Sequence, residues 1–162
     1  MIRRLLLTAL IAIAWPAAAQ SVPAADYTDM WYLPSESGWG VSFTQHAPSS
    51  QAYAVWYTYD PREADPATPG NFRPLWLVMA GGNWTSPTRI TGPVYVLNGT
   101  PFYQSGSNRS ITAVGSFTFD FASASSATFT YDIAPPQGLA ASDPAYGLPA
   151  FSGSKTISRQ SF

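Results

Sequence analysis

Polar and apolar side chains alternate along most of this chain, with the two-residue period that places successive side chains on opposite faces of a β-strand. The clearest run lies at 110–121, where Phe117, Phe119 and Phe121 alternate with polar residues. Helical periodicity is almost absent after the first twenty residues. The pattern predicts eight strands, at residues 30–33, 38–46, 51–60, 74–80, 84–97, 110–121, 127–133 and 153–161.

The links between these segments favour strands that follow one another directly. Gly81-Gly82-Asn83 and Asn98-Gly99 carry the residues of tight turns. We therefore expect an all-β fold, an antiparallel meander of about eight strands that closes into a barrel and so hides its edges. A two-sheet β-sandwich is the alternative. Two Pro- and Gly-rich stretches, 61–73 and 135–152, predict long loops.

The first residues have the features of a secretory signal peptide. Arg3 and Arg4 precede an apolar run at 5–14, and Ala17-Ala18-Ala19 supplies small residues for cleavage. We therefore expect residues 1–19 to be removed and residues 20–162 to form a single exported β-domain, periplasmic or extracellular. The apolar run is too short to cross a bilayer as a helix, and no later segment reaches that length, so the mature chain is expected to lack a membrane span.

Composition narrows the possible chemistry. The chain has no cysteine, which excludes thiol catalysis, zinc–thiolate sites and iron–sulfur clusters. It has one histidine, His46, so no transition-metal site is expected, and no cofactor. Charged residues make up 10% of the chain and form no basic run, so nucleic acid is not an expected partner.

Six short motifs are spread over nearly the whole chain. They are Trp-x-x-Pro-x-Glu-Ser-Gly-Trp-Gly at 31–40, Trp-Tyr-Thr-Tyr-Asp at 56–60, Pro-Leu-Trp-Leu-Val-Met at 74–79, Gly-Pro-x-Tyr at 92–95, Val-Gly-x-x-x-x-x-Phe at 114–121 and Lys-x-Ile-x-Arg-Gln-x-Phe at 155–162. In these motifs the chain resembles a family of exported bacterial β-domains of uncharacterised function. The resemblance implies export and a β-fold, and it implies no activity and no catalytic residues. The two long loops depart from the family pattern.

Aromatic residues make up 15% of the chain and are the main candidates for ligand contact. On the predicted strands 51–60 and 74–80, both faces carry aromatic or apolar side chains. One face is expected to fill the core, and the other to line a cavity or form an exposed platform for sugar rings or flat apolar ligands. The residues predicted to contact ligand are Trp39, Trp56, Trp76 and Trp84.

These features predict a non-catalytic binding or accessory module. Its expected partner is a glycan, an apolar small molecule or another envelope protein. The alternative is a purely structural or protein-interaction domain with buried aromatics, in which Gly38 and Gly40 shape the beginning of a strand around Trp39.

A hydrolase is the less favoured alternative. It would use His46 with a serine and an aspartate, or a pair of carboxylates. No nucleophile-elbow motif is present, and no spacing pairs the available carboxylates, which are Glu36, Asp60, Asp120 and Asp132. The acidic stretch 60–65 could bind calcium, although it lacks the EF-hand pattern.

One ion pair is predicted from the expected closure of the barrel. Glu36 follows the first predicted strand and Arg159 lies in the last one, so a closed meander makes these segments neighbours. We expect Glu36 and Arg159 to pair there and to help set the register of the closing strands.

Overall fold

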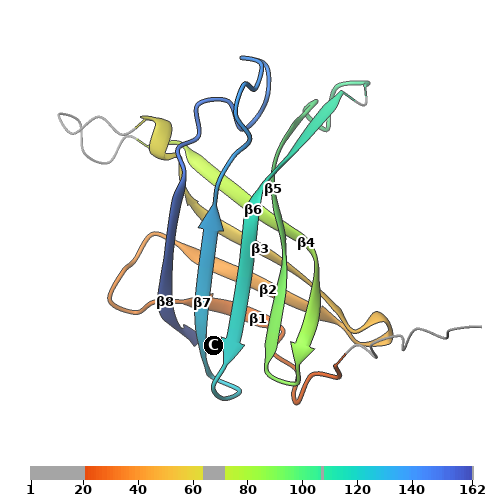
Figure 1. Cartoon of the computed structure of the whole chain (residues 1–162), viewed down its shortest axis with the longest axis vertical. Helices are drawn as coiled ribbons and strands as arrows, with labels where there is room; N and C mark the ends of the chain where they lie inside the picture. The colour runs from red at the N-terminus through yellow and green to blue at the C-terminus, as the bar shows by residue number, and fades with distance from the viewer. Residues whose placement is uncertain (1–20, 64–71, 107, 162) are drawn as a thin grey trace, which may run out of the picture.

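The computed structural model describes residues 21–63, 72–106 and 108–161. In these residues the chain forms a closed antiparallel barrel in which each strand pairs with the next and β8 returns to β1 (Figure 1). The strands are β1 (Asp29–Tyr32), β2 (Gly40–His46), β3 (Gln51–Tyr59), β4 (Pro74–Ser86), β5 (Arg89–Gly99), β6 (Arg109–Phe121), β7 (Ser126–Ile133) and β8 (Phe151–Arg159). Two short 3-10 turns, η1 (Ala47–Ser49) and η2 (Pro61–Glu63), follow β2 and β3. The predicted barrel is therefore confirmed, and the sandwich alternative is wrong.

The predicted turn at Gly81-Gly82-Asn83 is also wrong. β4 continues through these residues to Ser86, and the hairpin turn to β5 comes after it. A Cβ on Gly82 would lie 2.9 Å from Met79 Cε, and one on Gly92 would lie 2.8 Å from the Gly82 Cα. The glycines therefore permit a close approach of β4 and β5 beneath the Met79 side chain, at a point where the register of the two strands shifts.

The interior of the barrel is filled by aromatic and aliphatic side chains from every strand. Phe117, Phe119 and Phe121 point inward, as the alternation in the sequence predicts, and all three are buried. Phe119 and Phe129 stack from neighbouring strands with ring centroids 5.0 Å apart. Each buried ring contributes roughly 1.5–3 kcal/mol through removal of apolar surface from water, so this cluster is the main source of stability.

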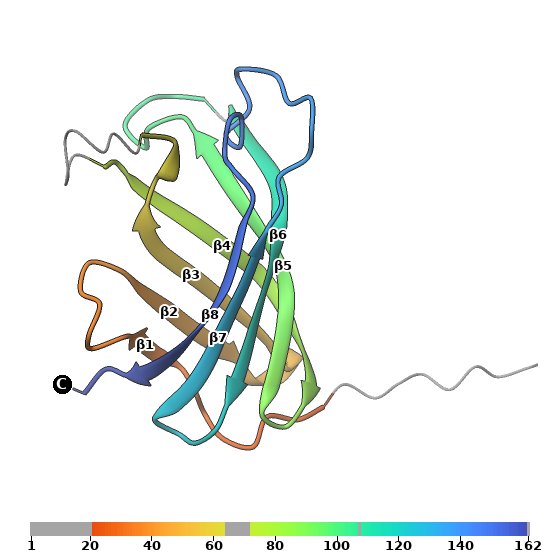
Figure 2. The ribbon, with the colours of Figure 1, turned by 60° about the vertical axis from the view of Figure 1, so that its left-hand side comes forward.

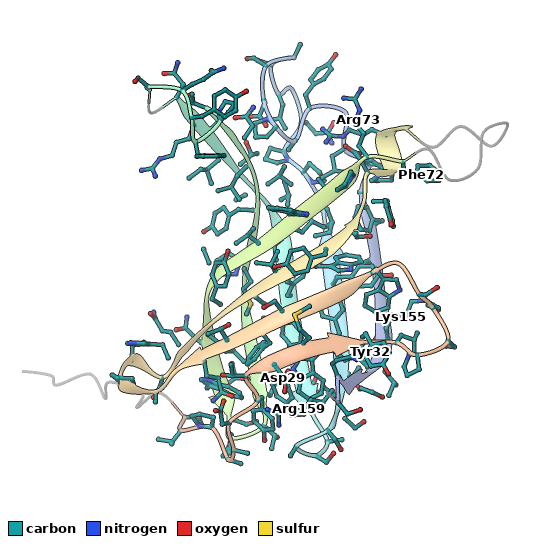
Figure 3. All side chains as sticks on the ribbon, turned by 180° about the vertical axis from the view of Figure 1, so that it is seen from behind. Asp29, Tyr32, Phe72, Arg73, Lys155 and Arg159 are labelled. Atoms are coloured by element: carbon teal, nitrogen blue, oxygen red, sulfur yellow. The ribbon has the colours of Figure 1, made fainter. Side chains whose placement is uncertain are left out.

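The seam between β1 and β8 is short. Only Trp31 and Tyr32 of β1 are in register with β8, opposite Arg159 and Ser158. The Arg159 guanidinium fastens this end of the seam, because its Nε donates to Asp29 Oδ2 at 2.9 Å and its Nη2 donates to the Thr28 carbonyl at 2.8 Å. Asp29 and Arg159 lie side by side in Figure 3.

Glu36 does not pair with Arg159, so that prediction is wrong. Glu36 accepts from Lys155 Nζ instead, at 2.7 Å. The reason is the antiparallel direction of the seam: moving forward from Trp31 toward Glu36 means moving backward along β8, from Arg159 toward Lys155. Two ion pairs, Glu36 with Lys155 and Asp29 with Arg159, therefore join the first and last parts of the barrel in place of the predicted one.

The long loop between β7 and β8 lies at one end of the barrel (Figure 2). Its Ala145 and Leu148 side chains are buried and belong to the hydrophobic core. Arg62 in η2 holds this loop, since its Nη1 donates to the carbonyls of Pro144 and Tyr146 at 2.8 and 3.0 Å. The predicted loop at 135–152 is therefore packed against the core, and we call it the lid. Most of the predicted loop at 61–73 lies outside the described residues.

The segment predicted to be a signal peptide, residues 1–19, also lies outside the described residues. In the part of the chain that is described, the structure contains no helix of the length and apolarity needed to cross a membrane.

Candidate functional site

The four tryptophans predicted to contact ligand do not form one surface. Trp56 and Trp84 are buried, Trp39 is half-buried, and Trp76 is 61% exposed. The prediction of a single patch is therefore wrong, because β-strand alternation directs Trp56 into the barrel and Trp76 away from it.

Trp39 has a structural position at the seam. Its ring lies edge-on to Trp56, with centroids 6.2 Å apart, and its Nε1 donates to Glu36 Oε2 at 3.2 Å. Gly38, with φ of 103°, takes a backbone conformation that residues with side chains rarely adopt. Trp39 and Glu36 thus continue the closure of the barrel where the pairing of β1 with β8 has ended, with Lys155 as the partner on β8.

Trp84 packs at another level of the core. Its ring contacts Tyr27, Phe43 and Phe121, with centroids between 5.8 and 6.4 Å apart. The indole nitrogens of Trp56 and Trp84 have no hydrogen-bond partner among the described residues. Both tryptophans therefore serve the apolar core, and neither is available to a ligand on the surface.

Trp76 belongs to an exposed group of rings on the outer face of β3 and β4. Tyr57 lies directly opposite it across the strands, and the two rings meet edge-on with centroids 5.7 Å apart. Tyr59, two residues along β3, is 50% exposed, and its ring lies beside Gly38. We call Tyr57, Tyr59 and Trp76 the aromatic platform.

A cleft of about 650 Å³ opens beside the platform. It lies where β4 and β5 separate, because their ladder ends at Val78 and Tyr95 although both strands continue. In Figure 3, the beginning of β4, next to the labelled Arg73, diverges from the β5–β6 hairpin. The residues that line the cleft are Asp60, Arg62, Arg73, Pro74, Leu75, Trp76, Val96, Leu97, Asn98 and Pro144.

Charge in the cleft is organised around Asp60. Burial favours a raised pKa for this carboxyl, but hydrogen bonds from the Arg62 side chain and main chain, and the charges of Arg62 and Arg73, outweigh it and hold the pKa below its usual value. The Arg62 Nε lies 2.8 and 3.0 Å from the two Asp60 oxygens. Asp60 is therefore ionised at neutral pH and serves to hold Arg62 against the lid.

Among the residues considered for hydrolysis, the structure brings a serine to His46. His46 Nδ1 lies 2.8 Å from Ser49 Oγ at an exposed position, and no carboxylate hydrogen-bonds to His46 within the described part of the chain. A hydrogen bond from Lys155 lowers the pKa of Glu36, as the Arg62 contacts do for Asp60. Lowered pKa values disfavour the protonated acid that glycoside hydrolysis needs.

The described ranges contain no group of three or more His, Cys, Asp or Glu side chains placed to hold an ion. The acidic stretch considered for calcium, 60–65, lies partly outside the described residues.

The cleft was not predicted from the sequence. Its walls come partly from the strands predicted at 74–80 and 84–97 and partly from the predicted loops, and its position depends on where the ladder between β4 and β5 ends. One signal was present: Leu97 and Ile111 are apolar residues at the outward positions of β5 and β6, and both are exposed. In comparisons with protein-family models, curated proteins and solved structures, no match to this chain was found.

Proposed function

We propose that this protein is an exported, non-catalytic binding module that holds a glycan against the aromatic platform. The observation that carries the proposal is the exposure of three neighbouring rings, Tyr57, Tyr59 and Trp76, on one outer face of a rigid barrel. Exposed rings beside polar groups provide the stacking surface and hydrogen-bonding edge that a sugar needs. The amino-terminal pattern of residues 1–19 is the basis for export.

The openness of the platform favours a glycan over a small apolar ligand. Apolar small molecules bind in concave pockets that enclose most of their surface, whereas Trp76 is 61% exposed on the outside of the barrel. The neighbouring cleft offers polar groups from Asp60, Arg62 and Asn98 at the edge of the rings. A sugar stacked on Trp76 could reach this edge with its hydroxyl groups.

Tryptophan fluorescence provides the test. Of the tryptophans in residues 20–162, Trp76 is the one with a largely exposed ring, so acrylamide quenching of the mature protein should report mainly on it. We expect one class in a panel of glycans to protect the fluorescence and to raise the melting temperature. Trp76→Ala, which also removes the fluorescent reporter, should abolish that rise in melting temperature. Tyr53→Ala, an exposed tyrosine of β3 outside the platform, is the matched control.

Two outcomes would contradict the proposal. If no glycan in the panel changes quenching or the melting temperature, the platform does not bind sugars. If a hydrophobic dye or fatty acid protects Trp76 and glycans do not, the ligand belongs to the apolar class instead.

A further inference from the structure

The cleft between β4 and β5 is bounded by two rigid strand edges. β4 stays paired with β3 along the cleft, through Leu75 and Leu77, and β5 stays paired with β6 through Leu97 and Asn98. Pairing with β3 and with β6 therefore keeps β4 and β5 extended, while the edges that β4 and β5 turn toward each other separate. Such edges carry main-chain donors and acceptors that can pair with another chain.

Hydrogen bonding on the far side of β4 shows which of its groups face the cleft. Antiparallel pairs alternate between those that exchange main-chain hydrogen bonds and those that do not. The Asp60 N–H donates to the Arg73 carbonyl at 2.9 Å, so the bonded positions of β4 toward β3 are Leu75 and Leu77. The N–H and carbonyl of Trp76 consequently point away from β3, into the cleft.

Main-chain bonds between β5 and β6 likewise show which groups of β5 face the cleft. The Thr100 N–H donates to the Asn108 carbonyl at 3.0 Å, so Asn98 is a bonded position toward β6. The N–H and carbonyl groups of Leu97 and Gly99 therefore point away from β6, toward the cleft. Because the ladder with β4 ends at Tyr95, neither residue has a place in a described strand pair on that side.

We propose that the cleft accepts an extended peptide segment of a partner protein, which adds a strand to the edge of β5 at Leu97 and Gly99. Two residues separated by one position present their donors and acceptors about 7 Å apart, the repeat that another strand matches. The β4 edge is the less complete wall, since Pro74 has no N–H. Regularly spaced backbone groups favour a peptide over a glycan at this edge.

Side chains around the cleft specify the chemistry of that segment. Leu75 and Val96 are buried beneath the cleft, and Leu97 and Ile111 are 46% and 52% exposed on the outer surface. The inserted strand would therefore carry apolar side chains toward the barrel and apolar or aromatic ones beside Trp76. The partner segment is free of proline at its bonded positions.

The tip of the same hairpin extends the contact surface. Phe102 and Tyr103 are 99% and 73% exposed, and their rings lie edge-on with centroids 5.7 Å apart. Exposed aromatic residues are typical of the residues that dominate protein–protein binding energy. A partner that places a strand against β5 could bury this pair with an adjacent surface. The proposal concerns main-chain edges and does not depend on glycan binding by the platform.

Peptide panning tests the proposal. A phage-displayed library of random peptides of about nine residues is panned on the immobilised mature protein. Leu97→Pro removes an N–H that points into the cleft and no ladder bond to β6, whereas Leu97→Ala keeps the N–H and removes the side chain. We expect enriched peptides with alternating apolar residues. They should bind wild type and Leu97→Ala with similar affinity, and Leu97→Pro at least about tenfold more weakly. Tyr53→Ala, distant from the cleft, should bind like wild type.

Several results would overturn the proposal. One is that panning on wild type enriches no peptides beyond those that panning on Leu97→Pro enriches. Another is that the enriched peptides bind wild type and Leu97→Pro equally well. If Leu97→Pro fails to fold, amide exchange of the wild-type complex replaces it: a bound peptide should slow the Leu97 and Gly99 amides at least about tenfold, and unchanged exchange refutes strand addition. A wild-type dimer that Leu97→Pro converts to monomer would show that a second copy, not a partner, occupies the edge.

Discussion

Lys155, in the last strand, donates to Glu36, in the connection after the first strand, at 2.7 Å across the seam of the barrel. The same Glu36 carboxylate accepts from the Trp39 indole at 3.2 Å. One carboxylate therefore joins a strand, a connection and a tryptophan that packs on the core. The Glu-Ser-Gly-Trp-Gly stretch is part of how the barrel closes.

The seam pairs can be tested by a double-mutant cycle. Glu36→Gln and Lys155→Met should each lower the melting temperature by a few degrees at most, because both side chains are partly exposed, and the double variant should lose less than the sum. Glu36→Gln combined with Arg159→Leu should give additive losses, since these residues have different partners. Coupling between Glu36 and Arg159 in this cycle would contradict the structure.

Arg62 should matter more to stability than an ordinary surface arginine. It hydrogen-bonds to Asp60 and to two carbonyls of the lid, so Arg62→Gln should cost about 2 kcal/mol in the free energy of unfolding. Arg89→Gln is the control, because Arg89 and Asp120 form an exposed pair at 3.2 Å, and its cost should stay below about 0.5 kcal/mol. Urea denaturation measures the free energy of unfolding of both variants, and equal losses would show that Arg62 does not hold the lid.

Asp60 predicts an acid-dependent loss of stability. Its folded pKa lies below its ordinary value of 3.8, so the unfolded chain takes up the proton first as the pH falls. The stabilisation is complete above about pH 5 and is lost as the pH falls through the folded pKa. Comparison of urea midpoints at about pH 7 and pH 3 should show a larger loss for wild type than for Asp60→Asn. Parallel profiles would mean that Asp60 is not held by Arg62.

Two buried tryptophans offer a matched comparison. The Trp31 Nε1 donates to the Tyr27 carbonyl at 3.0 Å, whereas the Trp84 indole nitrogen has no partner among the described residues. Trp31→Phe should therefore cost roughly 1–2 kcal/mol more than Trp84→Phe, since it leaves a buried carbonyl unpaired. Chemical denaturation of the two variants checks the difference, and the reverse order would disprove this account of the core.

The paired glycines of β4 and β5 also have a control. Gly92→Ala would bring a Cβ within 2.8 Å of the Gly82 Cα, so we expect a loss of about 2–3 kcal/mol. At Gly81 a Cβ would meet nothing within 4 Å, and Gly81→Ala should change stability by less than about 0.5 kcal/mol. Comparable melting temperatures for the two variants would show that β4 and β5 do not approach as closely as described.

Local alternation was sufficient to predict eight strands in order and much of the core. Two predicted bounds are wrong, because β4 takes in Trp84 and β5 runs through the predicted turn at Asn98-Gly99. The run from Phe117 to Phe121 points inward as expected, because a strand with one polar face has only one stable orientation. Gly81-Gly82 misled the prediction, since two glycines suit a tight turn as well as a close strand approach. Only the packing of Met79 across β4 and β5 decides between them.

The candidate site was harder to predict, because it depends on contacts between distant residues. Alternation places Trp56 and Tyr57 on opposite faces of β3, but it does not show which face points outward, because both faces carry apolar or aromatic side chains. The pairing of Tyr57 with Trp76 puts these two rings on the same, outer face. Likewise, Glu36 and Arg159 lie in the two segments that close the barrel, yet the register at Trp31 gives each another partner. The cleft depends on the point at which a ladder ends, which no local pattern records.

The short seam also sets the order in which the barrel can form. Every strand pairing except β1 with β8 joins consecutive strands, so hairpins can assemble with small losses of chain entropy. Closure instead joins Asp29 and Arg159, 130 positions apart, through two register pairs. Because distant contacts are entropically costly and slow to form, we expect an open, curled sheet to come first. The pairing of β1 with β8 would then be the last and slowest step of folding.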